Sequence, residues 1–244
     1  MPTPKATQIF LAIDTADLAT ATAQAAATAG VIAGIKLGLE FFMAHGPGGV
    51  RSATPRGRPL FLDLKLHDIP NTVAGAVRAV TPLQPTLLTV HTGGGAAMLR
   101  AALDAAGETA VRTGIARPRM IGVTVLTSLA EADMGAIGQQ GPIADQARRL
   151  AVLAKSCGLD GVVCSPHEIA ALRAECGDGF LLVVPGIRPA WAAAGDQKRV
   201  MTPAEAARLG ADYLVIGRPI TGADDPAAAA RRIAAEVAAA APAA

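Results

Sequence analysis

Short apolar runs recur along the chain, and stretches with helical periodicity separate them. The runs are rich in Val, Ile and Leu and show little polar alternation, which is typical of strands in a parallel sheet covered by helices. The predicted strands are Gln8–Ile13, Val31–Leu37, Pro59–Leu66, Thr86–His91, Met120–Val125, Gly161–Cys164, Phe180–Val184 and Tyr213–Ile216.

Helices are predicted between these strands. They are Leu18–Ala29, Leu39–Ala44, Thr72–Val80, Gly95–Ala105, Ile143–Ser156, Pro166–Glu175, Pro203–Leu209 and Pro226–Ala240. Strands that alternate with helices form βαβ units. Eight such units in 244 residues predict an α/β protein with a (β/α)8 TIM barrel, as a single domain over residues 1–244. A doubly wound open sheet is the alternative.

Two irregular stretches interrupt this pattern. Gly46–Arg58 is rich in Pro, Gly and Arg, and we expect a solvated loop that is too short to separate domains. Pro185–Arg199 follows the seventh strand, where we expect a mobile lid over a site. It carries Trp191, which could cover that site or simply pack the loop.

The composition is that of a globular protein, with 51% hydrophobic and 17% charged residues. A net charge of +2 provides no basic excess for general nucleic-acid binding. Three cysteines without a CxxC pair indicate a reducing compartment. The sequence shows no signal peptide and no apolar run long enough to span a membrane, so we expect a cytoplasmic protein without a membrane partner.

Candidate chemistry is concentrated in the segment Leu60–Thr72, which reads LFLDLKLHDIPNT. With a period of two, the leucines face the helices, whereas Phe61, Asp63, Lys65 and His67 face the barrel interior. An internal Asp–Lys pair could merely plug the barrel. Asp68 directly beyond it favours an active site at the carboxyl end of the strand.

Other strand ends also bring charges to this mouth. Asp14 ends the first strand and Lys36 ends the second. With Asp63 and Lys65 they predict an alternating array of carboxylates and ammonium groups around the mouth.

A phosphate site is predicted beside this array. Pro185-Gly186-Ile187-Arg188 and Gly217-Arg218 follow the seventh and eighth strands, where barrels commonly bind phosphate. For Gly93–Gly95 we expect only a tight turn. The histidines lack metal-ligand spacing, and Cys164 is expected to be a buried structural residue.

The segment from Asp63 to Thr72, DLKLHDIPNT, resembles the signature of the orotidine 5′-phosphate decarboxylase family. Supporting motifs follow in family order over nearly the whole chain. They are Asp14, GIKLG at 34–38, TVLTS at 124–128, PGIR at 185–188, Asp196-Gln197 and Gly217-Arg218.

The resemblance implies decarboxylation of orotidine 5′-phosphate to UMP, without metal or cofactor, in a homodimer with shared active sites. It implies that Lys65 protonates C6 and that Asp63 lies beside the scissile carboxylate. Lys36 and Asp14 would contact the ribose, and Asp68 would belong to the neighbouring subunit's site. The remaining implied substrate contacts are Ile69, Thr72, Thr127 or Ser128, Pro185, Arg188, Gln197, Gly217 and Arg218.

Two alternatives stay open at this stage. A metal-dependent sugar-phosphate decarboxylase or aldolase shares the D-x-K-x-x-D pattern and would need an acidic ligand such as Glu40. A barrel that has lost catalysis could bind a nucleotide as a sensor, although the intact set of Asp63, Lys65 and Asp68 argues against it.

Overall fold

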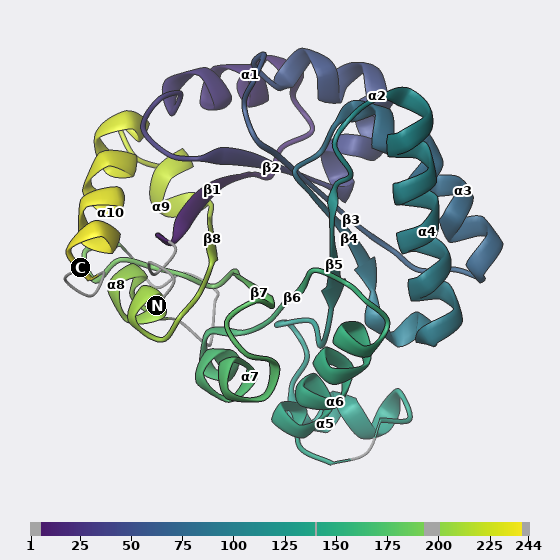
Figure 1. Ribbon diagram of the computed structural model, residues 1–244. Helices are drawn as coiled ribbons and strands as arrows, with labels where there is room; N and C mark the ends of the chain where they lie inside the picture. Colours follow the sequence, from purple (N-terminus) through teal and green to yellow (C-terminus); the bar gives the residue numbers. More distant parts are fainter. Residues whose placement is uncertain (1–5, 140, 193–200, 241–244) are drawn as a thin grey trace.

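A computed structural model describes residues 6–139, 141–192 and 201–240. Its parallel strands form a closed barrel in sequence order, so the barrel prediction is confirmed and the open sheet is not (Figure 1). The strands are β1 (Gln8–Ile13), β2 (Gly34–Gly38), β3 (Leu60–Leu66), β4 (Leu87–His91), β5 (Arg119–Val123), β6 (Gly161–Val163), β7 (Leu181–Val184) and β8 (Tyr213–Ile216).

Helices surround the barrel on its outside (Figure 1). They are α1 (Leu18–Ala27), α2 (Leu39–Ala53), α3 (Pro70–Val80), α4 (Gly95–Thr113), α5 (Glu131–Ala136), α6 (Ile143–Ser156), α7 (Ile169–Cys176), α8 (Pro203–Arg208), α9 (Arg218–Thr221) and α10 (Pro226–Ala240). Short 3-10 helices cover Thr81–Leu83, Thr92–Gly94 and Pro166–Glu168. Two short helices, α5 and α9, were not predicted because neither is long enough to show a helical period.

The predicted solvated loop at Gly46–Arg58 is wrong for its first half, because α2 extends to Ala53. Gly46 adopts φ 57° and ψ −161°, which interrupts the helix, and Pro47 then starts a second helical segment. The glycine and proline that suggested a loop therefore mark a kink.

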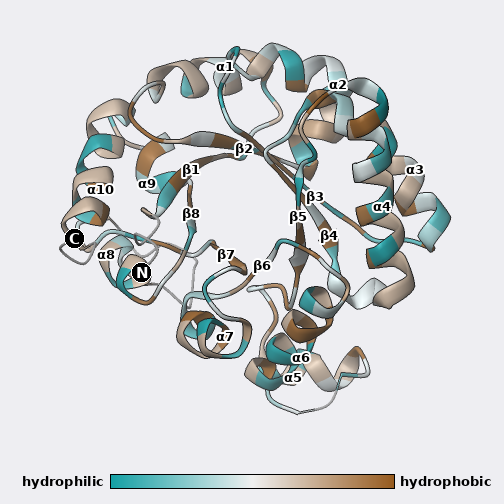
Figure 2. Cartoon of the chain, viewed as in Figure 1, coloured by the Kyte–Doolittle hydropathy of each residue, from teal (hydrophilic) through white to brown (hydrophobic). Residues whose placement is uncertain are grey.

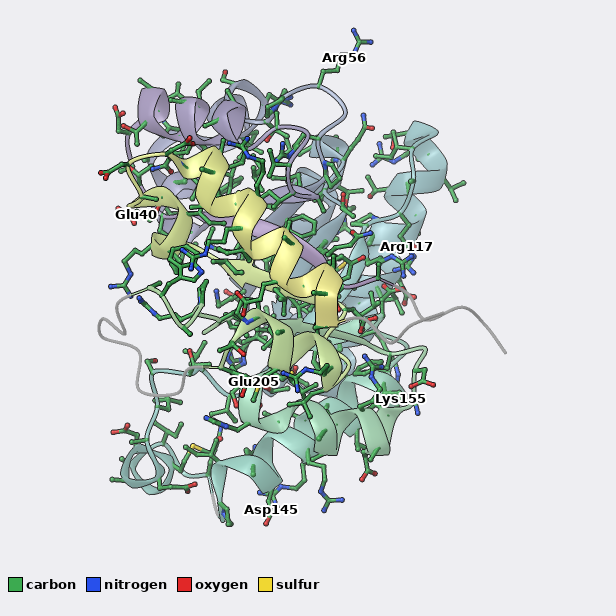
Figure 3. All side chains as sticks on the ribbon, turned by 90° about the vertical axis from the view of Figure 1, so that its left-hand side faces the viewer. Glu40, Arg56, Arg117, Asp145, Lys155 and Glu205 are labelled. Atoms are coloured by element: carbon green, nitrogen blue, oxygen red, sulfur yellow. The ribbon has the colours of Figure 1, made fainter. Side chains whose placement is uncertain are left out.

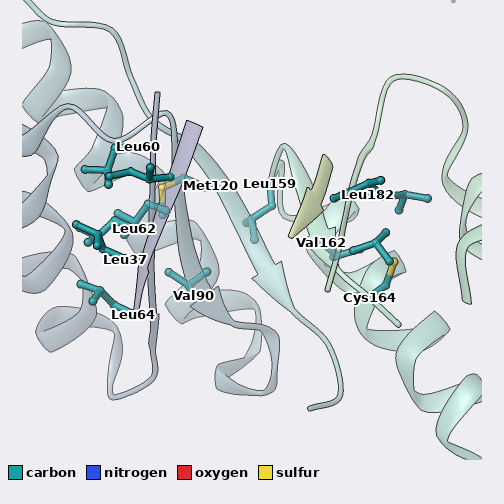
Figure 4. Packing of buried hydrophobic residues seen from close by; sticks show 14 of the residues in the cluster. Leu37, Leu60, Leu62, Leu64, Val90, Met120, Leu159, Val162, Cys164 and Leu182 are labelled. Carbon is teal, nitrogen blue, oxygen red and sulfur yellow. The ribbon is translucent and has the colours of Figure 1, made fainter. Parts of the chain in front are cut away.

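Two apolar layers lie on the two sides of the strands. Outside the barrel, Leu60, Leu62 and Leu64 pack among the helices, as the alternation predicts (Figure 4). Inside, Phe10 contacts Phe61 and Tyr213 edge to face, at centroid distances of 6.2 and 5.6 Å. The hydropathy colouring shows the helices to be mixed in polarity around their circumference (Figure 2). These aromatic residues belong to an apolar cluster inside the barrel, whereas the charged side chains Asp14, Lys36, Asp63 and Lys65 lie toward the carboxyl ends of the strands.

The amino ends of the strands carry two ion pairs, of which Arg173–Asp212 is largely buried and Arg117–Asp160 is partly exposed. Arg117 binds Asp160 through two hydrogen bonds of 2.8 Å, and Arg173 Nη2 lies 2.7 Å from Asp212 Oδ2. Each aspartate also accepts a hydrogen bond from a neighbouring strand, at Met120 N and Leu182 N respectively. Arg117 and Glu40, which follows β2, lie at opposite ends of the barrel in the side view (Figure 3). Among the described residues, no helix is both long and apolar enough to cross a membrane.

Candidate active site

The charged side chains of β1, β2 and β3 form one continuous chain at the carboxyl mouth. Lys36 Nζ lies 3.0 Å from Asp14 Oδ1 and 3.9 Å from Asp63 Oδ2. Lys65 Nζ lies 2.8 Å from the same Oδ2 of Asp63. Lys36 and Asp63 are each only 8% exposed, and opposite charges at this depth must be paired. The predicted alternating array is therefore present.

Strand register brings these charges together. Ala12 pairs with Lys36, and Gly38 pairs with Asp63 across β2 and β3. Gly38 also leaves the necessary room, because a Cβ at this position would lie 3.2 Å from Lys36 Nζ. The array thus depends on a small residue as much as on its charged ones.

Lys65 occupies a distorted part of β3. The β3–β4 register shifts between Leu62 and Leu66, and Lys65 has a φ of 49°. This left-handed conformation is rare for a residue with a side chain and costs of the order of 1 kcal/mol or more. Strain of this kind persists where the surrounding structure fixes it, and it often occurs at functional sites.

Thr89 on β4 is a member of the site that the sequence reasoning missed. Its Oγ1 donates to Asp63 Oδ1 at 3.0 Å and accepts from the backbone N–H of Lys65 at 2.8 Å. Side-chain alternation was the available signal. Leu87 faces the interior, and Thr89, two positions later, lies on the same face as a polar residue.

Two histidines stack at the rim next to this group. The rings of His67 and His91 are 5.0 Å apart and inclined by 14°. Burial lowers the pKa of His91, and the nearby His67 and Lys65 lower it further. Below them, Gly93 and Gly94 approach the rings in a 3-10 turn, as expected for a tight turn.

A pocket of about 150 Å³ connects the charged array with the predicted phosphate site. Asp14 and Lys36 line one part of it, and the other part is formed by the segments that follow β7 and β8. Those segments contribute Pro185, Gly186, Ile187, Arg188, Gly217, Arg218 and Pro219. Gly217 packs against β1, where a Cβ would lie 3.4 Å from Ala12 Cβ. Glycine therefore lets the turn approach the array closely.

The other predicted residues lie around this centre. Asp68, Ile69 and Thr72 are exposed at the start of α3, and Thr127 and Ser128 are exposed in the turn after β5. The pocket that contains Asp14 and Lys36 does not include them. Gln197 lies outside the described residues, as do Asp196 and the rest of 193–199 in the predicted lid. Trp191, in the described part of that stretch, packs under Arg232 of α10 at 4.5 Å and is not among the residues that line the pocket.

No metal cluster forms in the part of the chain that the structure describes, since no three His, Cys, Asp or Glu side chains gather there. Glu40, the acid that a metal-dependent relative would need, is exposed in the first turn of α2. Burial raises the pKa of the Cys164 thiol well above its usual value, which suits a structural residue rather than a nucleophile.

Comparison with known proteins agrees with this geometry. The family model described as "Orotidine 5'-phosphate decarboxylase / HUMPS family" matches residues 7–233. A protein of Rhodospirillum rubrum named orotidine 5′-phosphate decarboxylase is 58% identical over 240 residues, covering 97% of each chain. The protein of that name from Paramagnetospirillum magneticum is 56% identical, over 94% of this chain and 97% of its own.

Solved structures agree as well. The crystal structure of orotidine 5′-phosphate decarboxylase from Lactobacillus acidophilus superposes with a TM-score of 0.82 at 36% identity, covering 95% of this chain and 99% of the other. A crystal structure of the Pyrococcus horikoshii enzyme of the same name gives a TM-score of 0.74 at 26% identity, over 94% and 99% of the two chains. This chain therefore belongs to the orotidine 5′-phosphate decarboxylase / HUMPS family.

Proposed function

We propose that this protein decarboxylates orotidine 5′-phosphate to UMP and CO2, using neither a metal nor an organic cofactor. The observation that supports the proposal is the continuous chain of charges from Asp14 through Lys36 and Asp63 to Lys65. Its first two members, Asp14 and Lys36, line the same pocket as Gly217 and Arg218. The substrate has matching parts, since its reacting ring carries a carboxylate at C6 and its phosphate lies at the far end of the ribose.

The chemistry requires a stabilised negative charge. Loss of CO2 leaves an electron pair on C6, and the pyrimidine offers this carbon no electron sink. An ammonium group already fixed beside that carbon stabilises the developing charge without reorganisation. Lys65 takes this role and then transfers a proton from Nζ to C6, which completes UMP.

The neighbouring charges keep Lys65 in place. Asp63 holds the Lys65 ammonium at 2.8 Å and presents its own negative charge close to the substrate carboxylate. Their repulsion is relieved when neutral CO2 leaves. Lys36 and Asp14, at the other end of the array, bind the ribose hydroxyls, and Thr127 or Ser128 contacts the pyrimidine.

The phosphate supplies binding energy remote from C6. Arg218 and Gln197 hold its oxygens with the backbone of Gly217, Arg188 assists, and Pro185 lines the space for the ring. Binding energy gained here can be used to fix the ring against Lys65.

We also propose a homodimer in which Asp68, Ile69 and Thr72 complete the site of the partner subunit. All three are exposed at the start of α3, beside the mouth but outside its pocket. Ile69, which precedes α3, is 67% exposed, and Leu39 and Met43 of α2 are 55% and 75% exposed, so apolar residues are available for a subunit contact. Sedimentation of the dilute, active protein tests this; a fully active monomer would contradict shared sites.

We also propose that the protein is located in the cytoplasm. The three cysteines are all free and buried, as is usual in a reducing compartment.

The decisive experiment follows the ultraviolet absorbance of orotidine 5′-phosphate in the presence of EDTA, with UMP identified as the product. Rapid conversion supports both the reaction and its independence of metal. Conversion that EDTA abolishes and Mg²⁺ restores would refute metal independence. No conversion of this nucleotide, with Mg²⁺-dependent turnover of a sugar phosphate, would overturn the reaction itself.

A further inference from the structure

The Thr89 side chain contacts two parts of the charged array, the Asp63 carboxylate and the Lys65 backbone. Thr89 lies in the middle of β4, its side chain faces the barrel interior, and it is 0% exposed. Its hydroxyl reaches both the Asp63 carboxylate, at 3.0 Å, and the Lys65 backbone N–H, at 2.8 Å. A buried hydroxyl with two such partners is fully hydrogen-bonded and has a defined orientation.

The direction of both bonds follows from the donors available. The amide of Lys65 can only donate, so the Thr89 oxygen accepts there. The hydroxyl proton is then free to point at Asp63 Oδ1, which accepts it. Because Oδ1 is held in this way, Oδ2 is the oxygen that faces Lys65 Nζ at 2.8 Å and Lys36 Nζ at 3.9 Å.

The second bond acts on the backbone. Lys65 is held in the left-handed region, with a φ of 49°, where β3 and β4 lose their regular register. An N–H bond to a side chain of the adjacent strand stabilises this conformation at the point where the strand pairing is irregular.

We propose that Thr89 is a positioning residue for decarboxylation: through one hydroxyl group it fixes both the Asp63 carboxylate and the strained Lys65 backbone, so that the Lys65 ammonium is oriented before the substrate binds. The inference rests on the function proposed above. Thr89 itself has no role in binding the phosphate or the ribose.

The test compares four forms of the full-length protein. Thr89→Val keeps the shape of the side chain and removes the hydroxyl, whereas Thr89→Ser keeps the hydroxyl. Thr81→Val is the matched control, because Thr81 is also 0% exposed and its hydroxyl bonds the carbonyl of Val77 within α3. For each form one measures kcat and KM for orotidine 5′-phosphate, the inhibition constant of UMP, and the thermal midpoint.

We expect Thr89→Val to lower kcat by roughly tenfold to a hundredfold, the range for losing hydrogen bonds to charged groups. KM and the UMP inhibition constant should stay within about threefold, since Thr89 does not bind the remote groups. Thr89→Ser should recover most of kcat, and Thr81→Val should match the wild type. Should Thr89→Val fail to fold, Thr89→Ala against Thr89→Ser provides the same comparison.

Three outcomes would overturn the inference. They are an unchanged kcat in Thr89→Val, a serine variant as slow as the valine variant, or a loss of UMP affinity as large as the loss of kcat. The last would indicate general disorder of the site. Failure of the proposed function would look different, because the wild-type protein would then leave orotidine 5′-phosphate unchanged.

Discussion

Lys65 Nζ lies 2.8 Å from Asp63 Oδ2. The two residues are two positions apart on β3, in the part of the strand where its register against β4 shifts. In a regular strand such side chains would run parallel from the same face. The left-handed backbone of Lys65 changes this, and it leaves the Lys65 side chain 38% exposed at the mouth while Asp63 stays buried at 11%. A plug would not need an ammonium group that is open to solvent. The Lys65 side chain is therefore accessible from the mouth while its partner Asp63 is not.

Replacing Lys65 by alanine should abolish turnover of orotidine 5′-phosphate and leave UMP binding largely intact. The reason is that the proposed mechanism takes the proton for C6 from Lys65, whereas it assigns most of the binding energy to the phosphate and ribose. Single-turnover assays and UMP titration measure the two effects. The control is Lys155→Ala, on the surface of α6 (Figure 3). An active Lys65→Ala protein would refute its role as proton donor.

Replacing Arg218 by alanine should lower kcat/KM by roughly tenfold to a hundredfold, because a charge-assisted contact to the phosphate is lost. Arg218 follows Gly217 at the pocket. Arg56→Ala is the matched control, since Arg56 is exposed and precedes β3, away from the mouth (Figure 3). The proposed phosphate site would be wrong if kcat/KM did not change.

Two inactive variants should restore activity when their subunits are mixed. In a heterodimer of Lys65→Ala and Asp68→Asn, one shared site carries both substitutions and the other carries neither. After random exchange in an equal mixture, about half of the dimers are heterodimers, and each has one intact site of two. The mixture should therefore reach about a quarter of the wild-type rate at the same total protein concentration. The assay is decarboxylation after mild dissociation and reassociation. If the mixture remains as inactive as its components, each subunit uses its own Asp68.

Arg173→Ala should destabilise the fold without a direct effect on the site. Arg173 donates to the carbonyls of Gly177, Phe180 and Gly210 and to the carboxylate of Asp212, with 17% of its side chain exposed. Removing one partner of such a buried pair costs about 3 kcal/mol of unfolding free energy.

Denaturant unfolding measures the loss of unfolding free energy in Arg173→Ala. Arg148→Ala is the comparison, because Arg148 pairs with Glu175 at the surface, where side-chain exposures are 51% and 39%. That pair should contribute less than about 1 kcal/mol. Equal losses in the two variants would contradict the importance of burial at Arg173.

His91 should make the protein less stable as the pH falls. Its pKa is lower in the folded state than the ordinary value of 6.5, chiefly because of burial. The unfolded chain therefore binds more protons below about pH 6.5, and stability decreases as the pH falls through and below that value. Unfolding curves of the wild type and of His91→Gln, recorded from pH 7.5 to pH 5, should show a weaker decrease in the variant. If the stability of the two proteins fell equally with pH, the decrease would come from titratable groups other than His91.

The hydrophobic pattern was sufficient to predict the barrel. Strands β1 and β8 begin and end where the pattern places them, because a strand buried on both faces has a clear apolar signal with polar ends. The order of strands also placed Asp14, Lys36, Asp63 and Lys65 at one mouth, since parallel strands end on the same side. The kinked helix at Gly46 could not be predicted, because glycine and proline are equally typical of a loop and of a helix that restarts.

Within the site, the sequence alone determined which charged side chains gather at the mouth, because side-chain alternation is a local property and parallel strands end on the same side. Only the tertiary structure decided how they meet. The irregular register of β3 against β4, the left-handed Lys65 and the bridging hydroxyl of Thr89 each depend on two strands in contact. The pocket also depends on tertiary structure, because it joins Gly217 and Arg218 with Asp14 and Lys36. These residues come together only because β8 pairs with β1, although the two strands lie near opposite ends of the sequence.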